Sequence, residues 1–219
     1  MVTTILKRLA CLLPALLAIG CATPPKPYDY TAYKAHKPRS IVVLPPLNNS
    51  PDIKATYSMY AQVTYPLAEA GYYVLPVALV DETFKQNGLT SAADIHAVAP
   101  AKLVEIFGAD AALYVNITNY GASYVVLNSV VQVSASARLV DLKTGLLLWE
   151  GTATATNNEN NNSGGGLVGA LVAAAVKQIL NTVTDASHPV AGVASARLLS
   201  GGLSNGVLYG ARSQLYSTQ

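Results

Sequence analysis

The clearest catalytic spacing in this chain of 219 residues is Gly202-Leu203-Ser204-Asn205-Gly206, which matches the G-x-S-x-G pattern of serine hydrolases. That nucleophile needs a strand before it, a helix after it, and an aspartate and a histidine further along the chain. We expect a helix before Ser204, and the thirteen residues after Gly206 contain neither Asp nor His. The pattern therefore predicts a glycine-rich turn. A periplasmic hydrolase with Ser204 as its nucleophile stays open as the weakest hypothesis.

Other residues capable of chemistry lack the necessary context. Gly164–Gly169 spells G-x-G-x-x-G before a predicted helix, but an Asn-rich tract precedes it where a dinucleotide site needs a strand. The histidines and four of the glutamates are far apart on separate predicted elements, which favours surface roles over a metal site or an acid–base pair. These residues are His36, His96, His188, Glu69, Glu82, Glu105 and Glu150. We therefore expect no cofactor, no metal, no catalytic residue and no enzymatic activity.

The thiol of Cys21 is the remaining candidate. Lys7 and Arg8 form a short basic start, an uncharged apolar run extends from Leu9 to Ile19, and Gly20 follows. This order is typical of a secretory signal peptide, here residues 1–20. Removing it takes Cys11 away, so Cys21 would be the only thiol of the mature chain. A single thiol at the first position of an exported chain favours modification over a disulfide.

Leu17-Ala18-Ile19-Gly20-Cys21 resembles the lipobox of bacterial lipoproteins. The resemblance implies cleavage before Cys21, a diacylglycerol on its sulfur and an acyl chain on its new amino group. Ala18 departs from the pattern, which prefers Leu at that place. Ala22 is not the Asp that marks retention in the inner membrane of proteobacteria, which implies the outer membrane. A plain signal peptide, or a core helix that contains a cysteine, are the alternatives.

Residues 21–39 are predicted to be the lipid anchor and a proline-rich tether. Pro24-Pro25-Lys26-Pro27 disfavours helix and favours extended polyproline geometry. At about 3.1 Å per residue, a tether from Ala22 to Pro38 would span about 50 Å. The formal net charge of +2 gives no basic footprint for nucleic acid.

Residues 40–219 are predicted to form a single α/β (α+β) domain. An apolar strand at 40–44, a helix at 56–70 interrupted by Pro66, and a β-branched and aromatic strand at 72–80 would make a βαβ unit. Further helices are expected at 82–86, capped by Asp81, at 100–107 after Pro100, and at 189–199 after Pro189.

An antiparallel meander is expected in the second half of this domain. Apolar and polar residues alternate over 113–118, 131–139 and 147–154, and a hairpin turn at 141–145 joins the last two strands. With the βαβ unit, this predicts a mixed sheet of about five strands with helices packed on it and one wet face.

A flexible Asn/Gly loop is predicted at 156–166, followed by a helix at 167–184 with a wide apolar stripe. Packing against the sheet is the plainer interpretation of this helix. Its nearly charge-free opposite side would also suit contact with another subunit or with the membrane interface.

The mature sequence resembles a family of bacterial outer-membrane lipoproteins whose domain has no assigned function. The matching stretches are RSIVVLPPLNNSPDI, YPLAEAGYYVLPVALVDETFKQNGLT, FGADAALYVNITNYG and ARLVDLKTGLLLWEG. More distantly, the strand order is similar to the periplasmic α/β domains of TolB, LpoB and CsgG. The first hypothesis is therefore an outer-membrane lipoprotein with a non-enzymatic periplasmic domain that binds protein partners in envelope assembly or secretion. The alternative is a subunit of an oligomeric export or pore complex, with 167–184 at the contact between copies.

Overall fold

The structure is a computed structural model that describes residues 28–125, 128–157 and 186–219. The predicted leader, Cys21, the glycine motif at 164–169 and the predicted helix 167–184 lie outside the described residues.

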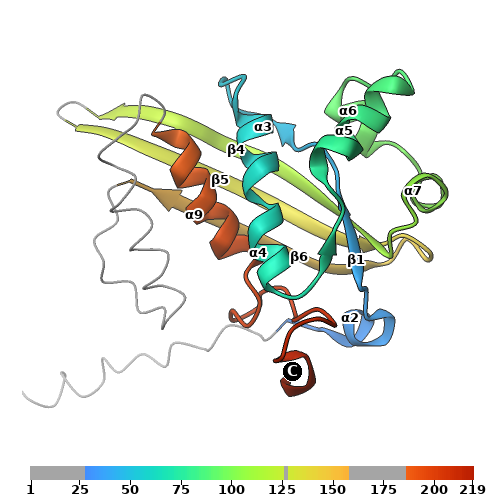
Figure 1. The fold of residues 1–219 in the computed structure, drawn as a ribbon. Coiled ribbons are helices and arrows are strands. Elements are labelled where there is room, and N and C mark those ends of the chain that lie inside the picture. Colours follow the sequence, from blue (N-terminus) through green and yellow to red (C-terminus); the bar gives the residue numbers. More distant parts are fainter. Residues whose placement is uncertain (1–27, 126–127, 158–185) are drawn as a thin grey trace, which may run out of the picture.

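The fold is built on one open mixed sheet of six strands, in the order β3-β1-β4-β5-β6, with β2 also paired to β4 (Figure 1). β1 pairs in parallel with β3 and β4, whereas β4, β5 and β6 form antiparallel pairs. The strands are β1 (Ser40–Val43), β2 (Leu47–Asn48), β3 (Tyr73–Val74), β4 (Ala111–Val125), β5 (Asn128–Asp141) and β6 (Leu147–Thr156). The predicted α/β class, the βαβ unit and the antiparallel meander are confirmed.

β4 and β5 are longer than predicted. The second half of β4 was missed because a bulge interrupts the alternation of apolar and polar residues. The register shifts between Ile117 and Asn119, which leaves Thr118 as the extra residue. Alternation in the sequence therefore stops at Thr118, yet Tyr120 returns to the buried face and is 3% exposed. Asn119 and Gly121 resemble turn residues in the sequence but continue the ladder.

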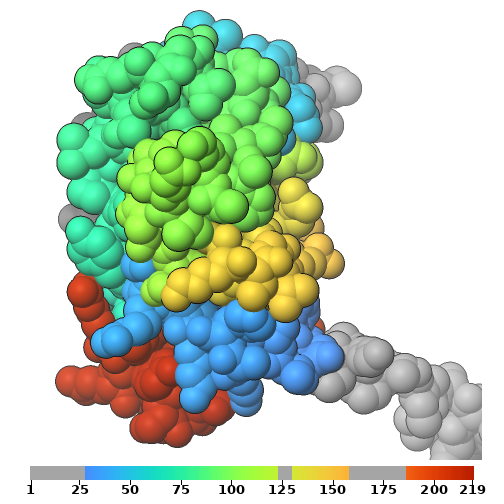
Figure 2. All heavy atoms as spheres, turned by 90° about the vertical axis from the view of Figure 1, so that its right-hand side faces the viewer, coloured from blue at the N-terminus to red at the C-terminus, as the bar shows by residue number. Residues whose placement is uncertain are grey.

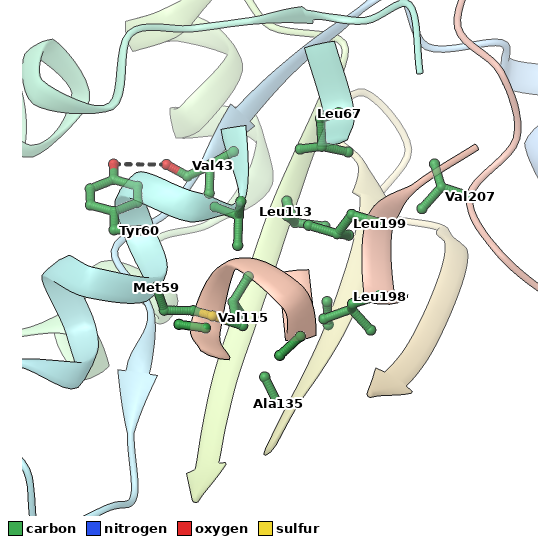
Figure 3. Close-up of a cluster of buried hydrophobic side chains, with 14 of the residues drawn as sticks. Val43, Met59, Tyr60, Leu67, Leu113, Val115, Ala135, Leu198, Leu199 and Val207 are labelled. Atoms are coloured by element: carbon green, nitrogen blue, oxygen red, sulfur yellow. Dashed lines mark hydrogen bonds between the residues drawn. The ribbon is translucent and has the colours of Figure 1, made fainter. Parts of the chain in front are cut away.

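Helices cover both faces of the sheet, and alternate residues of β1 and β4 contact the two sets. One face packs against α3 (Ala55–Gln62), α4 (Thr64–Glu69) and α9 (Ser187–Leu199). The other packs against α5 (Val77–Gln86), α6 (Ala92–His96) and α7 (Pro100–Phe107). Figure 3 shows Met59 of α3 and Leu198 and Leu199 of α9 gathered over Val115 and Ala135.

The strand predicted at 72–80 is wrong over most of its length. Only Tyr73 and Val74 pair with β1, and the chain enters α5 at Val77 directly after Pro76. A short apolar run fits a strand or a buried helix equally well, so periodicity alone misassigned it. Val80 and Phe84, one turn apart, are the buried residues of this helix. Asp81 is inside α5 and does not cap it.

The predicted helix at 56–70 is two helices, α3 and α4, with Pro66 in the first turn of the second. A proline is tolerated there because the first N–H groups of a helix have no partner within it. The interruption expected near Pro66 is therefore confirmed, and the second helix starts at Thr64. The helix predicted at 189–199 is α9, which starts at Ser187, while α6 was not predicted.

The folded part begins before residue 40, inside the segment predicted as tether. α2 (Thr31–His36) lies there, and Tyr33 is 2% exposed within the main core. Its hydroxyl lies 2.7 Å from the hydroxyl of Tyr72, which in turn donates to the carbonyl oxygen of Leu208. The proline-rich run ends at Pro27, and Tyr28, Tyr30 and Tyr33 after it are packing residues.

Candidate functional site

The motif around Ser204 is a turn, as predicted. Gly202 and Asn205 have positive φ angles of 77° and 58°, and Ser204 is exposed. Asn205 has a structural role, because its carbonyl oxygen accepts a hydrogen bond from the indole N–H of Trp149 and its Oδ1 accepts one from the backbone N–H of Tyr28. Nothing in the described part of the chain gives Ser204 a catalytic base.

The three histidines lie apart, and the described residues contain no group of three side chains able to hold a metal ion. His36 bonds to the carbonyl oxygen of Ala32 in its own helix. Glu69, Glu82, Glu105 and Glu150 are all exposed, in agreement with the solvated role expected for them.

A serine–histidine contact appears elsewhere, between residues 130 positions apart in the chain. Ser58 Oγ on α3 lies 2.8 Å from Nδ1 of His188 on α9, and Nε2 of His188 lies 2.8 Å from the amide nitrogen of Gln62. Ser58 Oγ also accepts a hydrogen bond from the hydroxyl of Tyr120. A hydrolytic base is normally oriented by a carboxylate and its nucleophile faces a cavity. Here an amide holds the ring, so this cluster joins two helices to β4.

The exposed face of the meander is polar and carries a hollow of about 490 Å³. Cross-strand register builds its floor in two rows. Tyr114, Arg138 and Glu150 form the first, while Asn116, Ser136 and Thr152 form the second. His96 on α6 and Leu47 of β2 also line it. Sequence alternation predicted this wet face but not the hollow.

This polar hollow contains two charged side chains, those of Arg138 and Glu150. The Arg138 guanidinium lies 5.7 Å from the centre of the Tyr114 ring, a cation–π distance. Glu150 lies directly opposite Arg138, yet no ion pair joins them among the described residues. Both side chains therefore present their charge to solvent.

His96 is held as a hydrogen-bond donor at the rim of the polar hollow. Its Nε2 lies 2.9 Å from the carbonyl oxygen of Pro45, which can only accept, so Nε2 carries the proton. Burial lowers the pKa of His96 and the nearby Arg138 charge lowers it further, while the hydrogen bond to Pro45 acts in the opposite direction. The hollow therefore offers one cation, one anion and several neutral polar groups, an arrangement suited to binding.

A second hollow of about 350 Å³ lies where the two ends of the described domain meet. Its lining combines tyrosines and lysines from three segments: α2 and the residue after it, the residue before β3, and the segment 209–219. They are Tyr33, Lys34, Lys37, Tyr72, Tyr209 and Tyr216. Tyr28 and Tyr30 lie beside this end, with their ring centroids 5.0 Å apart. We call this region, residues 28–38 together with residues 205–219, the tyrosine end.

No helix among the described residues is long and apolar enough to cross a membrane. Cys21, the one site residue predicted from the sequence, lies seven positions before Tyr28, the first described residue. Its lipidation stays a prediction.

Comparison with known proteins gives the family. Residues 28–212 match the family described as "Putative lipoprotein GNA1162-like". A Neisseria meningitidis serogroup B protein named "Putative lipoprotein NMB1124/NMB1162" is 53% identical over 212 residues, covering 94% of this chain and 97% of that protein.

One solved structure agrees with this relationship. The crystal structure of lipoprotein GNA1162 from Neisseria meningitidis is 58% identical, with a TM-score of 0.54 over 66% of this chain and 100% of that one. The LpoB C-terminal domain from Salmonella enterica is 18% identical, with a TM-score of 0.40 over 53% of this chain and 81% of that one. None of these names states an enzymatic activity. The chain belongs to the GNA1162-like family of lipoproteins.

Proposed function

We propose that this protein is an outer-membrane lipoprotein whose periplasmic domain binds protein partners in envelope assembly or secretion and catalyses no reaction. The lipoprotein family supports the anchoring, and the leader with Cys21 supplies the attachment point. Ala22 in place of Asp supports the outer membrane. We place the leader at 1–20 and the anchor at Cys21, and we shorten the tether to 22–27 because the packed residues begin at Tyr28.

The polar hollow is the observation that carries the binding role. Arg138 and Glu150 face each other across two strands without pairing among the described residues, so each charge is available to a partner. Arginine and tyrosine are enriched among the residues that dominate binding energy at protein interfaces. Arg138 stacked over Tyr114 supplies both in one place.

Anchoring is tested by replacing Cys21 with Ser and fractionating the envelope. We expect the wild-type protein to sediment with the outer membrane and Cys21→Ser to lose both membrane association and leader cleavage. Cys11→Ser is the matched control, since it changes a thiol inside the leader and leaves the anchor intact. A fully processed Cys21→Ser protein that stays in the same membrane would overturn the anchoring.

Partner binding is tested with a photo-crosslinking amino acid at Thr152, which lies in the polar hollow, and at Tyr65, an exposed residue of α4. We expect a discrete protein adduct from position 152 in living cells and none from position 65. Adding Arg138→Ala is expected to remove that adduct. Equal labelling from both positions, or an adduct indifferent to Arg138→Ala, would contradict the role of this surface.

The two alternative functions predict different experimental results. A complex of many copies in mild detergent, with 152 crosslinking to a second copy, would support the export or pore subunit instead. An esterase activity abolished by Ser204→Ala would support a hydrolase.

A further inference from the structure

We propose that the tyrosine end lies against the bilayer that holds the lipid anchor, with Lys34, Lys37 and Arg212 contacting anionic phospholipid headgroups. This inference rests on the proposed lipidation of Cys21. It adds an orientation of the domain and a second, non-covalent contact with the membrane.

The length of chain before the domain limits the orientation. Seven Cα–Cα steps separate Cys21 from Tyr28, and at most about 3.6 Å per residue they reach about 25 Å. A globular domain with this many described residues is about 40 Å across. The tether is therefore too short to turn the opposite end of the domain toward the membrane.

Tyr28 is fixed to the tyrosine end and cannot lengthen the tether without breaking contacts. Its backbone N–H donates to Oδ1 of Asn205 at 3.0 Å, and its hydroxyl accepts from the backbone N–H of Glu150. Tyr30 donates its hydroxyl hydrogen to the carbonyl oxygen of Gly206. Figure 2 shows the blue atoms of the first described segment and the red atoms of the last one together at the bottom.

The side chains exposed at this end suit a lipid–water interface. Lys34 and Lys37 are exposed and have no acidic partner among the described residues. The Arg212 guanidinium lies 5.1 Å from the centre of the Tyr73 ring, which is 47% exposed. Leu215 adds an exposed apolar side chain. Aromatic rings with long cations are enriched where membrane proteins meet headgroups, and basic residues bind anionic lipid.

Away from the tyrosine end, the domain differs in how its exposed lysines are paired. There, α5 and α7 carry cations that are already paired, Lys85 with Asp81 at 2.6 Å and Lys102 with Glu105 at 2.8 Å. In Figures 1 and 2 the α5 and α6 helices lie at the top, far from α2. Lys34, Lys37 and Arg212, none of which has an ion-pair partner among the described residues, place positive charge on the end that the tether keeps near the bilayer.

The orientation is measured on the lipidated full chain in vesicles. Lipid on Cys21 leaves an introduced cysteine as the only free thiol of the mature protein. A fluorophore is attached at Ser217→Cys, in the tyrosine end, or at Ala93→Cys, exposed on α6, and vesicles carry a quencher on the lipid. We expect strong quenching at 217 and little at 93 in vesicles of phosphatidylcholine with phosphatidylglycerol.

The charge contribution is measured with Lys34→Gln/Lys37→Gln and with the matched control Lys85→Gln/Lys102→Gln. Two lysines near an anionic surface are expected to change the equilibrium for contact by about 30-fold. The first variant should therefore lose most of the quenching at 217 and the control should keep it.

The outcomes separate the two proposals. Protein that floats with the vesicles but is quenched equally at 217 and 93 overturns the orientation while anchoring stands. Equal quenching at 217 in phosphatidylcholine alone overturns the assignment to anionic headgroups. Protein that does not float overturns the anchoring itself, and the orientation with it.

Discussion

Alkaline pH is expected to unfold this protein because three phenol groups are buried in its main core. Tyr33, Tyr60 and Tyr72 are 2%, 2% and 3% exposed. Tyr60 donates to the carbonyl oxygen of Val43 at 2.9 Å (Figure 3), and Tyr72 donates to that of Leu208 at 2.6 Å. Burial raises the pKa of all three hydroxyls above the usual value, with smaller contributions from neighbouring groups.

The size of the effect follows from proton linkage. Above about pH 10 the unfolded chain loses these protons while the native protein keeps them. The free energy of unfolding then falls by about 1.4 kcal/mol per pH unit for each tyrosine, or about 4 kcal/mol per unit for the three. About 6 kcal/mol is lost by about pH 11.5, which is comparable to the whole stability of an ordinary domain.

The assay is urea unfolding between about pH 7 and about pH 11.5, followed by the fluorescence of Trp149, the only tryptophan of the chain. Tyr60→Phe should reduce the alkaline slope by about 1.4 kcal/mol per pH unit, because one buried phenol proton is removed. It should also cost about 1–2 kcal/mol at neutral pH, where the Val43 carbonyl loses its donor. Tyr65→Phe, at a ring that is 69% exposed, is the control. An unchanged slope in Tyr60→Phe would refute the reasoning.

Three further substitutions test packing and charge. Gly151→Ala places a Cβ 2.4 Å from the Trp149 ring, so we expect a loss of about 1–3 kcal/mol in urea unfolding and a shifted Trp149 emission; unchanged stability would contradict this contact. Gly192→Ala, in the interior of α9, gains up to about 1 kcal/mol of helix propensity. Its Cβ would lie 3.0 Å from Oε1 of Gln62, whose amide must shift against its hydrogen bond to His188, so the net change in the free energy of unfolding in the same assay should stay below about 1 kcal/mol. Burial alone would raise the pKa of Asp110, but hydrogen bonds from Arg39 and Ser40 lower it overall. Its contribution is therefore present above the unfolded pKa and lost as the pH falls through the lowered value, so Asp110→Asn should show a shallower loss of stability in acid.

The strands could be predicted from the sequence where the alternation of apolar and polar residues matches the alternation of buried and exposed side chains. Polar residues from Gln132 to Arg138 alternate with apolar ones because β5 buries one face and exposes the other. Prediction failed where the pattern is ambiguous or interrupted, as at Val77–Val80, where Pro76 was the one signal that a helix begins, and at the Thr118 bulge.

The functional surfaces were less accessible to sequence reasoning because they depend on register and on distant segments. The opposition of Arg138 and Glu150 could not be found by counting outward from the hairpin at 141–145, because the register shifts between Leu139 and Val140 and moves the pairing by one residue. Nothing local links Ser58 with His188, which meet only through packing of α3 on α9. The tyrosines after Pro27 could be counted but not placed, because their partners lie about 180 residues later.

That last pairing also sets an order for folding. Tyr28 and Tyr30 find their hydrogen-bond partners at Asn205 and Gly206, which are 177 and 176 positions away. Contacts between such distant positions form late, because a long loop must close before they can stabilise anything. A chain that emerges amino end first cannot make these contacts until residues 205 and 206 have appeared. Until then the chain stays incompletely folded, and an incompletely folded polypeptide passes through a narrow protein channel more easily than a folded one.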